Sequence, residues 1–315
     1  MTLIFTKTFA NVALQTSDRL VTWKTKEKNI IPFDRRANKT IIFKAADGIA
    51  VIGFAGAAFI NNVPTDEWLA EVLYGRRLPR DEDGRIAPFR SDDGVRLHHL
   101  KALELIRFIR NAVANIHLAN FQGYGLEISI AGVYERKKKL LNFQAHLNRT
   151  VRGRKVSVEK AVELKSETLC YSIGSTLGID LLERGGPPSL GMCWTDMIQA
   201  TKKTARKEST VGADVLGVIL WASKENQAFK FHAEAEFFSE NQNKIPLPSY
   251  VPTGSYPTSI TPWFVSPHNA IPPQHLTGNF RQVDGNTEIV FIGAKGQDGL
   301  AFMFSSVKRP PNIAP

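Results

Sequence analysis

The stretch TLIFTKTFANVALQTSDRLVT, residues 2–22, decides how this chain begins to fold. β-Branched and apolar residues form two runs on either side of Ala10 and Asn11, the pattern of two strands joined by a turn. A second stretch, KTIIFKAADGIAVIGFAG at residues 39–56, repeats this pattern around the turn dipeptide Asp47-Gly48. The two stretches therefore predict two antiparallel hairpins near the start of the chain.

Further along the chain, elements of one kind follow one another instead of alternating. Helices are predicted over residues 65–74, 95–118 and 192–207, and strands over residues 126–130, 139–147, 169–173, 214–222 and 227–235. A last hairpin is predicted from residues 288–293 and 300–305. A doubly wound parallel sheet would alternate strands with helices, so this order favours two antiparallel sheets with helices packed outside them.

The composition is that of a folded protein with an ordinary core. The chain has 315 residues, of which 43% are hydrophobic and 22% charged, and no apolar run is long enough to cross a membrane. The N-terminus lacks the pattern of a secretory signal, and Cys170 and Cys193 cannot build a disulfide framework. We therefore expect a cytoplasmic protein without a membrane partner.

The net charge of +10 points to anionic partners or acidic substrates. Part of the excess is local, because residues 136–155 hold eight Lys or Arg and no acidic residue. This stretch, with Phe143 and His146 inside it, could bind nucleic acid through phosphate contacts and stacking. A solvated hairpin face, or a surface that meets an acidic neighbouring subunit, explains the same charges, and nucleic acid is the less favoured partner.

Motifs for metals and cofactors are weak in this sequence. His98, His99 and His117 do not form an H-E-x-x-H pattern, and the Gly185-Gly186 cluster is not followed by a Walker lysine. No metal and no cofactor are therefore expected.

With its elements placed, the chain resembles the proteasome β-subunit and HslV group of N-terminal nucleophile hydrolases. Thr2 opens the first strand, and SDRLVT supplies the family's D-x-x-x-T through Asp18 and Thr22 at the family spacing from Thr2. Lys39 leads a strand that runs into GFAG at residues 53–56. The segments LEISIAGVYE, YSIGST, ARKESTVG and DVLGVIL then follow in the family's order.

The resemblance covers residues 2–222 and implies an α+β fold, a four-layer αββα sandwich that begins at the nucleophile. Residues 1–222 are expected to form this domain, and residues 223–315 a C-terminal extension of strands and Pro-rich segments packed on it. The chain departs from the family in three ways. The lysine comes later than the family spacing, which implies an insertion within residues 24–38, and Glu208 and Val211 replace an aspartate and a serine.

The resemblance also implies a catalytic site. Thr2 would be the nucleophile once Met1 has been removed, and its own α-amine would be the base. Lys39 would lower the pKa of that amine by charge repulsion, and Asp18 would hold Lys39 in place. Three further roles are carried over by resemblance: Gly53 as the backbone donor to the oxyanion, and Ser175 and Glu208 as residues that orient the amine and the water.

Each of these residues also has a purely structural explanation. Asp18 is a common turn residue, and Lys39 could be a solvated lysine on a strand edge. Turn chemistry explains Ser175, Glu208 could be a surface acid, and Gly53 could permit close packing.

The function predicted from this pattern is an N-terminal threonine amidohydrolase, in particular a peptidase, that acts on a peptide or amide substrate through an acyl-enzyme. The alternative is a catalytically inactive proteasome-like scaffold or subunit that binds an anionic partner. The family resemblance also implies self-assembly into a homo-oligomer, with a ring as one form.

Overall fold

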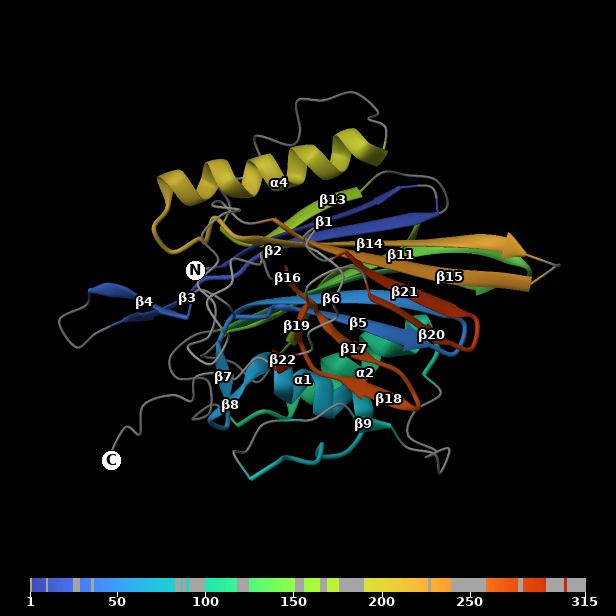
Figure 1. Ribbon diagram of the computed structural model, residues 1–315, viewed down its shortest axis with the longest axis horizontal. Coiled ribbons are helices and arrows are strands. Elements are labelled where there is room, and N and C mark those ends of the chain that lie inside the picture. Colours follow the sequence, from blue (N-terminus) through green and yellow to red (C-terminus); the bar gives the residue numbers. More distant parts are fainter. Residues whose placement is uncertain are drawn as a thin grey trace.

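The computed structural model describes most of the chain and shows two stacked sheets with helices outside them (Figure 1). The described residues are 2–9, 11–24, 29–34, 37–82, 86, 89–90, 100–117, 125–150, 156–164, 169–175, 190–225, 228–238, 259–276, 280–292 and 303–304. Within these residues, no helix is long and apolar enough to span a membrane.

The first sheet has seven strands and contains the predicted N-terminal hairpin. Its strands, in spatial order, are β13 (Leu169–Gly174), β1 (Leu3–Phe9), β2 (Val12–Asp18), β14 (Val215–Glu225), β15 (Ala228–Phe238), β21 (Thr287–Ile292) and β20 (Phe280–Asp284). Strand β1 lies between β2 and β13 and is antiparallel to both. The beginning of the chain is therefore an inner strand of this sheet.

The second sheet has eight strands and contains the predicted hairpin around Asp47-Gly48. Its strands, in spatial order, are β12 (Val156–Leu164), β11 (Lys139–Arg149), β10 (Leu126–Arg136), β6 (Gly48–Gly56), β5 (Thr40–Ala45), β17 (Trp263–Val265), β18 (Asn269–Ile271) and β9 (Phe89–Arg90). Smaller sheets are formed by β3 (Val21–Lys24) with β4 (Ile30–Asp34), by β7 (Phe59–Ile60) with β8 (Val63–Pro64), and by β16 (Ser259–Ile260), β19 (Gln274–Leu276) and β22 (Met303–Phe304).

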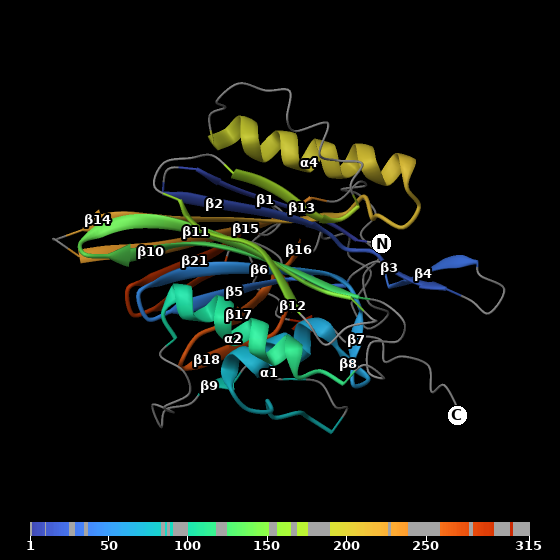
Figure 2. The same ribbon diagram turned by 180° about the vertical axis from the view of Figure 1, so that it is seen from behind.

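Three described helices cover the outer faces of the two large sheets. Helix α4 (Leu190–Lys207) lies on the seven-stranded sheet, and α1 (Thr65–Tyr74) and α2 (Ala102–Ala114) lie on the eight-stranded sheet (Figures 1 and 2). Helix α2 is shorter than the predicted helix 95–118, of which residues 95–99 and 118 lie outside the described residues.

Buried apolar residues fill each boundary between these elements. One cluster lies between the sheets and contains residues from strands of both, among them Ile42, Val51, Val218 and Phe264. A second cluster, which includes Leu3, Phe5 and Met197, joins the seven-stranded sheet to α4, and a third, which includes Ile41, Phe43 and Leu105, joins the eight-stranded sheet to α1 and α2. The molecule is thus mostly sheet with few helices, an arrangement compatible with the predicted αββα sandwich.

Residues beyond 222 contribute strands to both large sheets. The predicted boundary at residue 222 falls inside β14, and the following strand, β15, is its antiparallel neighbour. Strand β21 then pairs in parallel with β15, and β17 pairs in parallel with β5 at the register Trp263 to Ile41. The C-terminal segment is therefore joined by backbone hydrogen bonds to the strands that precede it.

The predicted last hairpin, residues 288–293 with 300–305, is wrong. Strand β21 pairs with β20 and β15, whereas β22 pairs with β19 in a separate sheet. The error has a physical reason, because two short apolar strands carry no signal that states which other strand each will join.

Candidate functional site

Asp18, at the end of β2, is the centre of a buried polar cluster that draws four segments of the chain together. Its Oδ1 accepts hydrogen bonds from the backbone N–H of Leu3 at 2.8 Å and from Lys39 Nζ at 3.0 Å. Its Oδ2 accepts from the backbone N–H groups of Leu20 at 3.1 Å and Gly212 at 2.9 Å. Asp18 is completely buried, so these four donors replace the water that a carboxylate would otherwise bind.

Lys39 is buried beside Asp18 and is not a solvated edge lysine. Its side chain is 2% exposed, and Nζ donates to Asp18 Oδ1 and to the carbonyl oxygen of Leu20, the latter at 2.6 Å. Burial lowers the pKa of the Lys39 ammonium, and the charge and hydrogen bond of Asp18 oppose that change. Asp18 is therefore the group that favours a cation at this position.

Thr2 lies directly against this cluster, at the start of β1. The peptide group between Thr2 and Leu3 donates its N–H to Asp18, and the carbonyl oxygen of Thr2 accepts a 2.8 Å hydrogen bond from the N–H of Ser175. Thr2 is also buried. The backbone on both sides of the Thr2 carbonyl carbon is therefore held in place.

Gly174, which ends β13, lets the Ser175 turn approach Thr2 this closely. Its φ is +82°, and a Cβ at this position would lie 1.8 Å from the carbonyl oxygen of Thr2. No side chain fits there, and φ in the left-handed region disfavours other residues as well. The glycine of YSIGST is thus required by the contact between this turn and Thr2.

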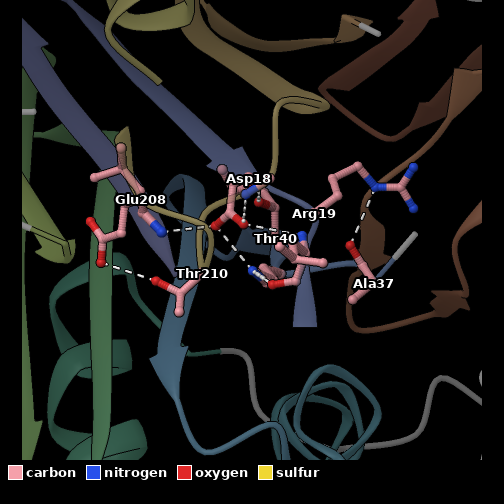
Figure 3. A network of polar contacts seen from close by, with 11 residues as sticks. Asp18, Arg19, Ala37, Thr40, Glu208 and Thr210 are labelled. Atoms are coloured by element: carbon pink, nitrogen blue, oxygen red, sulfur yellow. Dashed lines mark hydrogen bonds and ion pairs between the residues drawn. The ribbon is translucent and has the colours of Figure 1, made fainter. Parts of the chain in front are cut away.

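Ser175 and Glu208, which were each assigned to the site by resemblance, contact each other although they are far apart in the sequence. Ser175 Oγ donates to Glu208 Oε2 at 2.5 Å, and Thr210 Oγ1 donates to Glu208 Oε1 at 3.0 Å. Figure 3 shows Glu208 and Thr210 on one side of Asp18, with Arg19 and Ala37 on the other. Val211, which replaces the family's serine, is buried in the cluster beneath α4, and Thr210 supplies the hydroxyl beside the acid.

Gly53 lies inside β6, opposite Thr40 on one side and Ser129 on the other. The N–H of Phe54 donates to the carbonyl of Lys39, towards β5, and successive N–H groups of a strand point to opposite sides. The N–H of Gly53 therefore points towards β10, and a Cβ on Gly53 would lie 2.6 Å from Gln15 Oε1. Packing alone explains this glycine, and its role as oxyanion donor stays a prediction.

The structure thus brings Asp18 and Lys39 into one direct contact and Ser175 and Glu208 into another, with the Thr2 backbone between the two pairs. Sequence reasoning missed the backbone groups of Leu20 and Gly212 and the side chain of Thr210. Backbone donors and acceptors carry no residue-type signal. Thr210, however, lies only two residues after Glu208, so its hydroxyl could have been considered.

Among the described residues, no group of three or more His, Cys, Asp or Glu side chains is arranged to hold a metal ion. The cluster around Asp18 is instead filled by N–H donors from the protein itself.

No protein-family model matches this chain, and no curated protein matches it. Among solved structures, the chain is similar to Anbu (ancestral beta-subunit) from Yersinia bercovieri, with 15% identity, 69% of this chain and 81% of that chain covered, and a TM-score of 0.43. It is also similar to eukaryotic HslV from Trypanosoma brucei, with 16% identity, 69% and 98% covered, and a TM-score of 0.34. Any assignment of function to this chain therefore rests on the residues of the site.

Proposed function

We propose that this chain is an N-terminal threonine amidohydrolase that acts on peptide or amide substrates through an acyl-enzyme on Thr2. The observation that carries the proposal is the shared acceptor Asp18 Oδ1, which binds both Lys39 Nζ and the N–H of the Thr2–Leu3 peptide group. The ammonium of Lys39 thus lies within two hydrogen-bond lengths of the residue proposed to react. A buried cation is expensive to maintain, which favours a chemical role for Lys39.

The chemistry needs Thr2 to be the first residue. A threonine hydroxyl is a weak nucleophile at neutral pH and needs a base within hydrogen-bond reach. A free α-amine has a pKa of about 7.7–8.0 and would be largely protonated at pH 7. Repulsion from Lys39 would lower that pKa, so the amine could take the hydroxyl proton as Oγ1 attacks the amide carbonyl. The amine of the leaving group then receives the proton, and water releases the acyl group from Thr2.

Lys39 retains a donor for this task. An ammonium has three N–H groups. Among the residues that the structure describes, Asp18 and the carbonyl of Leu20 accept two of them. In the proposed mechanism the third donates to the Thr2 hydroxyl, where it would stabilise the alkoxide character that develops during attack.

Ser175 and Glu208 complete the proposed arrangement. The N–H of Ser175 holds the Thr2 carbonyl, and Ser175 Oγ donates a short hydrogen bond to Glu208. In this role they would position the α-amine and the hydrolytic water. The oxyanion donor is assigned to Gly53 by resemblance.

The proposal is tested first by the intact mass of protein purified with its natural N-terminus, which should lack one methionine. Hydrolysis of fluorogenic peptide amides should then fall by about 10³-fold or more in Thr2→Ala, and partly return in Thr2→Ser. Thr8→Ala, in the same strand, is the matched control and should keep its rate. Retention of Met1, or equal rates in Thr2→Ala and Thr8→Ala, would contradict the proposal.

A second candidate function, a scaffold that binds an anionic partner, is favoured by one surface feature. Arg136, Lys137, Lys138 and Lys139 form the exposed tip of the β10–β11 hairpin, and φ is positive at both central lysines. Such a tip presents four cations together. Retention on heparin that falls steeply with salt, and weakens when these residues are replaced by Ser, would support this candidate.

A further inference from the structure

We propose that Trp263 is a positioning residue for Lys39 and acts through Asp66 and Asn38. Strand β17, which carries Trp263, would then help to fix the geometry of the site. The inference rests on the proposed function and extends it to the C-terminal segment, which the family resemblance does not cover. It follows from a chain of buried hydrogen bonds that ends on the two neighbours of Lys39 in the sequence.

Asp66, in the first turn of α1, is the middle of this chain. Its Oδ2 accepts a 3.0 Å hydrogen bond from Trp263 Nε1 and a 3.4 Å hydrogen bond from Asn38 Nδ2. Asp66 is 5% exposed and Trp263 is 1% exposed, so water does not compete well for either bond. One carboxylate oxygen thus links a C-terminal strand to the residue that precedes Lys39.

Asn38 transmits this attachment to the backbone around Lys39. Its Nδ2 also donates to the carbonyl of Thr40 at 3.0 Å, and its Oδ1 accepts from the N–H of Thr40 at 3.4 Å. The Asn38 side chain therefore spans the Lys39 residue and fixes the backbone that follows it. Thr40 is held in turn, because its hydroxyl contacts Ser17 Oγ at 2.8 Å, next to Asp18.

The backbone of β17 provides a second connection between Trp263 and the Lys39 region. Trp263 lies in register with Ile41 in the parallel pairing of β17 with β5, the strand that begins directly after Lys39. A displacement of β17 would therefore disturb the Lys39 region in two ways, through the backbone pairing with β5 and through the hydrogen bond of the Trp263 indole to Asp66.

The charge state of Asp66 sets the strength of these hydrogen bonds. Burial and the neighbouring Glu67 raise the pKa of Asp66 to about 7, while the hydrogen bonds from Trp263 and Asn38 oppose the shift. Arg80 pairs with Glu67 at 2.8 Å. The two donors are therefore worth most when Asp66 is ionised.

Trp263→Phe tests the proposal, because it removes the indole donor and keeps an aromatic ring in the core. Trp68→Phe is the matched control on α1, since Trp68 packs against the same core and no hydrogen bond joins it to Asp66. Trp263→Phe should lower kcat by about tenfold to 10²-fold with little change in KM. It should also raise the lower apparent pKa of the pH–rate profile, because a displaced Lys39 repels the Thr2 amine less.

A second readout does not depend on catalysis. Acetic anhydride labels accessible amines, and mass spectrometry of the digested protein reports the labelling rate of Lys39. We expect Trp263→Phe to raise that rate by about tenfold through local opening, and Trp68→Phe to leave it unchanged. Equal labelling in the two folded variants would overturn the inference even if the enzyme is active. Raised labelling in a protein without hydrolase activity would overturn the proposed function and leave the attachment of Lys39 standing.

Discussion

Two groups of basic side chains in this molecule lie in opposite surroundings. Lys39 is buried, donates to Asp18 and Leu20, and has its pKa lowered by burial. The residues Arg136–Lys139 are exposed at the tip of a hairpin. A charge in the first setting is unscreened and costly, whereas a charge in the second is weakened by water and salt.

The difference shows why net charge says little about the site. The excess of positive charge draws attention to the hairpin tip, where four cations are adjacent in the sequence. Lys39, in contrast, lies away from that tip in a buried cluster, and its acceptor Asp18 is satisfied by four donors from separate segments. Substitutions in the two regions should therefore differ in size, in salt dependence and in their effect on activity.

The largest effect is expected from Lys39→Met, which leaves Asp18 buried without its cation. Removing one partner of a buried ion pair typically costs about 3–5 kcal/mol, which urea denaturation would measure as a lower free energy of unfolding. Lys137→Met, at the hairpin tip, is the matched control and should change stability by about 0.5 kcal/mol or less. Hydrolysis should be lost in Lys39→Met and kept in Lys137→Met.

A double variant, Asp18→Asn with Lys39→Met, sharpens this comparison. Because it removes both charges, it should recover part of the stability lost in Lys39→Met while remaining inactive. Equal stabilities of Lys39→Met and Lys137→Met would show that the buried pair does not have the role given to it here.

A smaller effect is expected where Gly174 touches Thr2. Gly174→Ala should cost roughly 1–3 kcal/mol in the free energy of unfolding, and hydrolysis should fall because the new Cβ displaces the Thr2 carbonyl. Gly285→Ala is the control, since Gly285 also has a positive φ but meets only the flexible end of Lys44. The control should lose stability and keep activity, whereas loss of activity in both variants would count against a local effect at Thr2.

The hairpins and helices near the start of the chain were predictable because local patterns encode them. Runs of β-branched and apolar residues joined by turn dipeptides mark β1, β2, β5 and β6, and apolar residues at three- and four-residue spacing mark α2. The pairing of Asp18 with Lys39 was expected through the order of family motifs, whereas the hydrogen bond between Ser175 and Glu208 was not predicted.

The contacts that the C-terminal segment makes near Lys39 could not be predicted, because they are long-range and the strands that make them are short. Strand β17 has three residues, too few for a periodic pattern, and its partner β5 is more than half the chain away. Asp66 in the first turn of a helix is explained by the helix dipole, so nothing in the sequence points to Trp263 as its partner. The parallel pairing of β21 with β15 could not be predicted either, because it also joins strands that are distant in the sequence.

Asp66 offers a pH-dependent test of moderate size. Its pKa is about 7 in the folded protein and 3.8 otherwise, so between these values the folded chain binds more protons than the unfolded chain. The free energy of unfolding contributed by this group therefore falls as pH rises from about 4 to 7 and then stays constant.

Asp66→Asn removes that dependence. The variant should gain roughly 1–2 kcal/mol relative to the wild type between about pH 5 and pH 7, measured by urea denaturation at each pH. Glu234→Gln is the comparison variant, because burial also raises the pKa of Glu234, which is only half-buried, so the same trend with a smaller size is expected. A constant difference between Asp66→Asn and the wild type across this range would contradict the raised pKa.

The smallest effect is expected at the hairpin tip itself. Lys138 has a φ of 61°, a backbone conformation that glycine adopts without strain. Lys138→Gly should stabilise the protein by about 0.5–1 kcal/mol in thermal or urea unfolding, leave hydrolysis unchanged and slightly weaken retention on heparin. A loss of hydrolysis in this variant would show that the tip takes part in the reaction.

The most direct test of the central claim, that Thr2 is a nucleophile activated beside Lys39 and Asp18, is its acylation by a small β-lactone. The protein would be treated at neutral pH, and the labelled residue located by mass spectrometry of its peptides. We predict one acyl group per chain on Thr2 Oγ1, no label in Lys39→Met, and full labelling in Lys137→Met. Absence of label on Thr2, or equal labelling of Thr2 in Lys39→Met and Lys137→Met, would contradict the account.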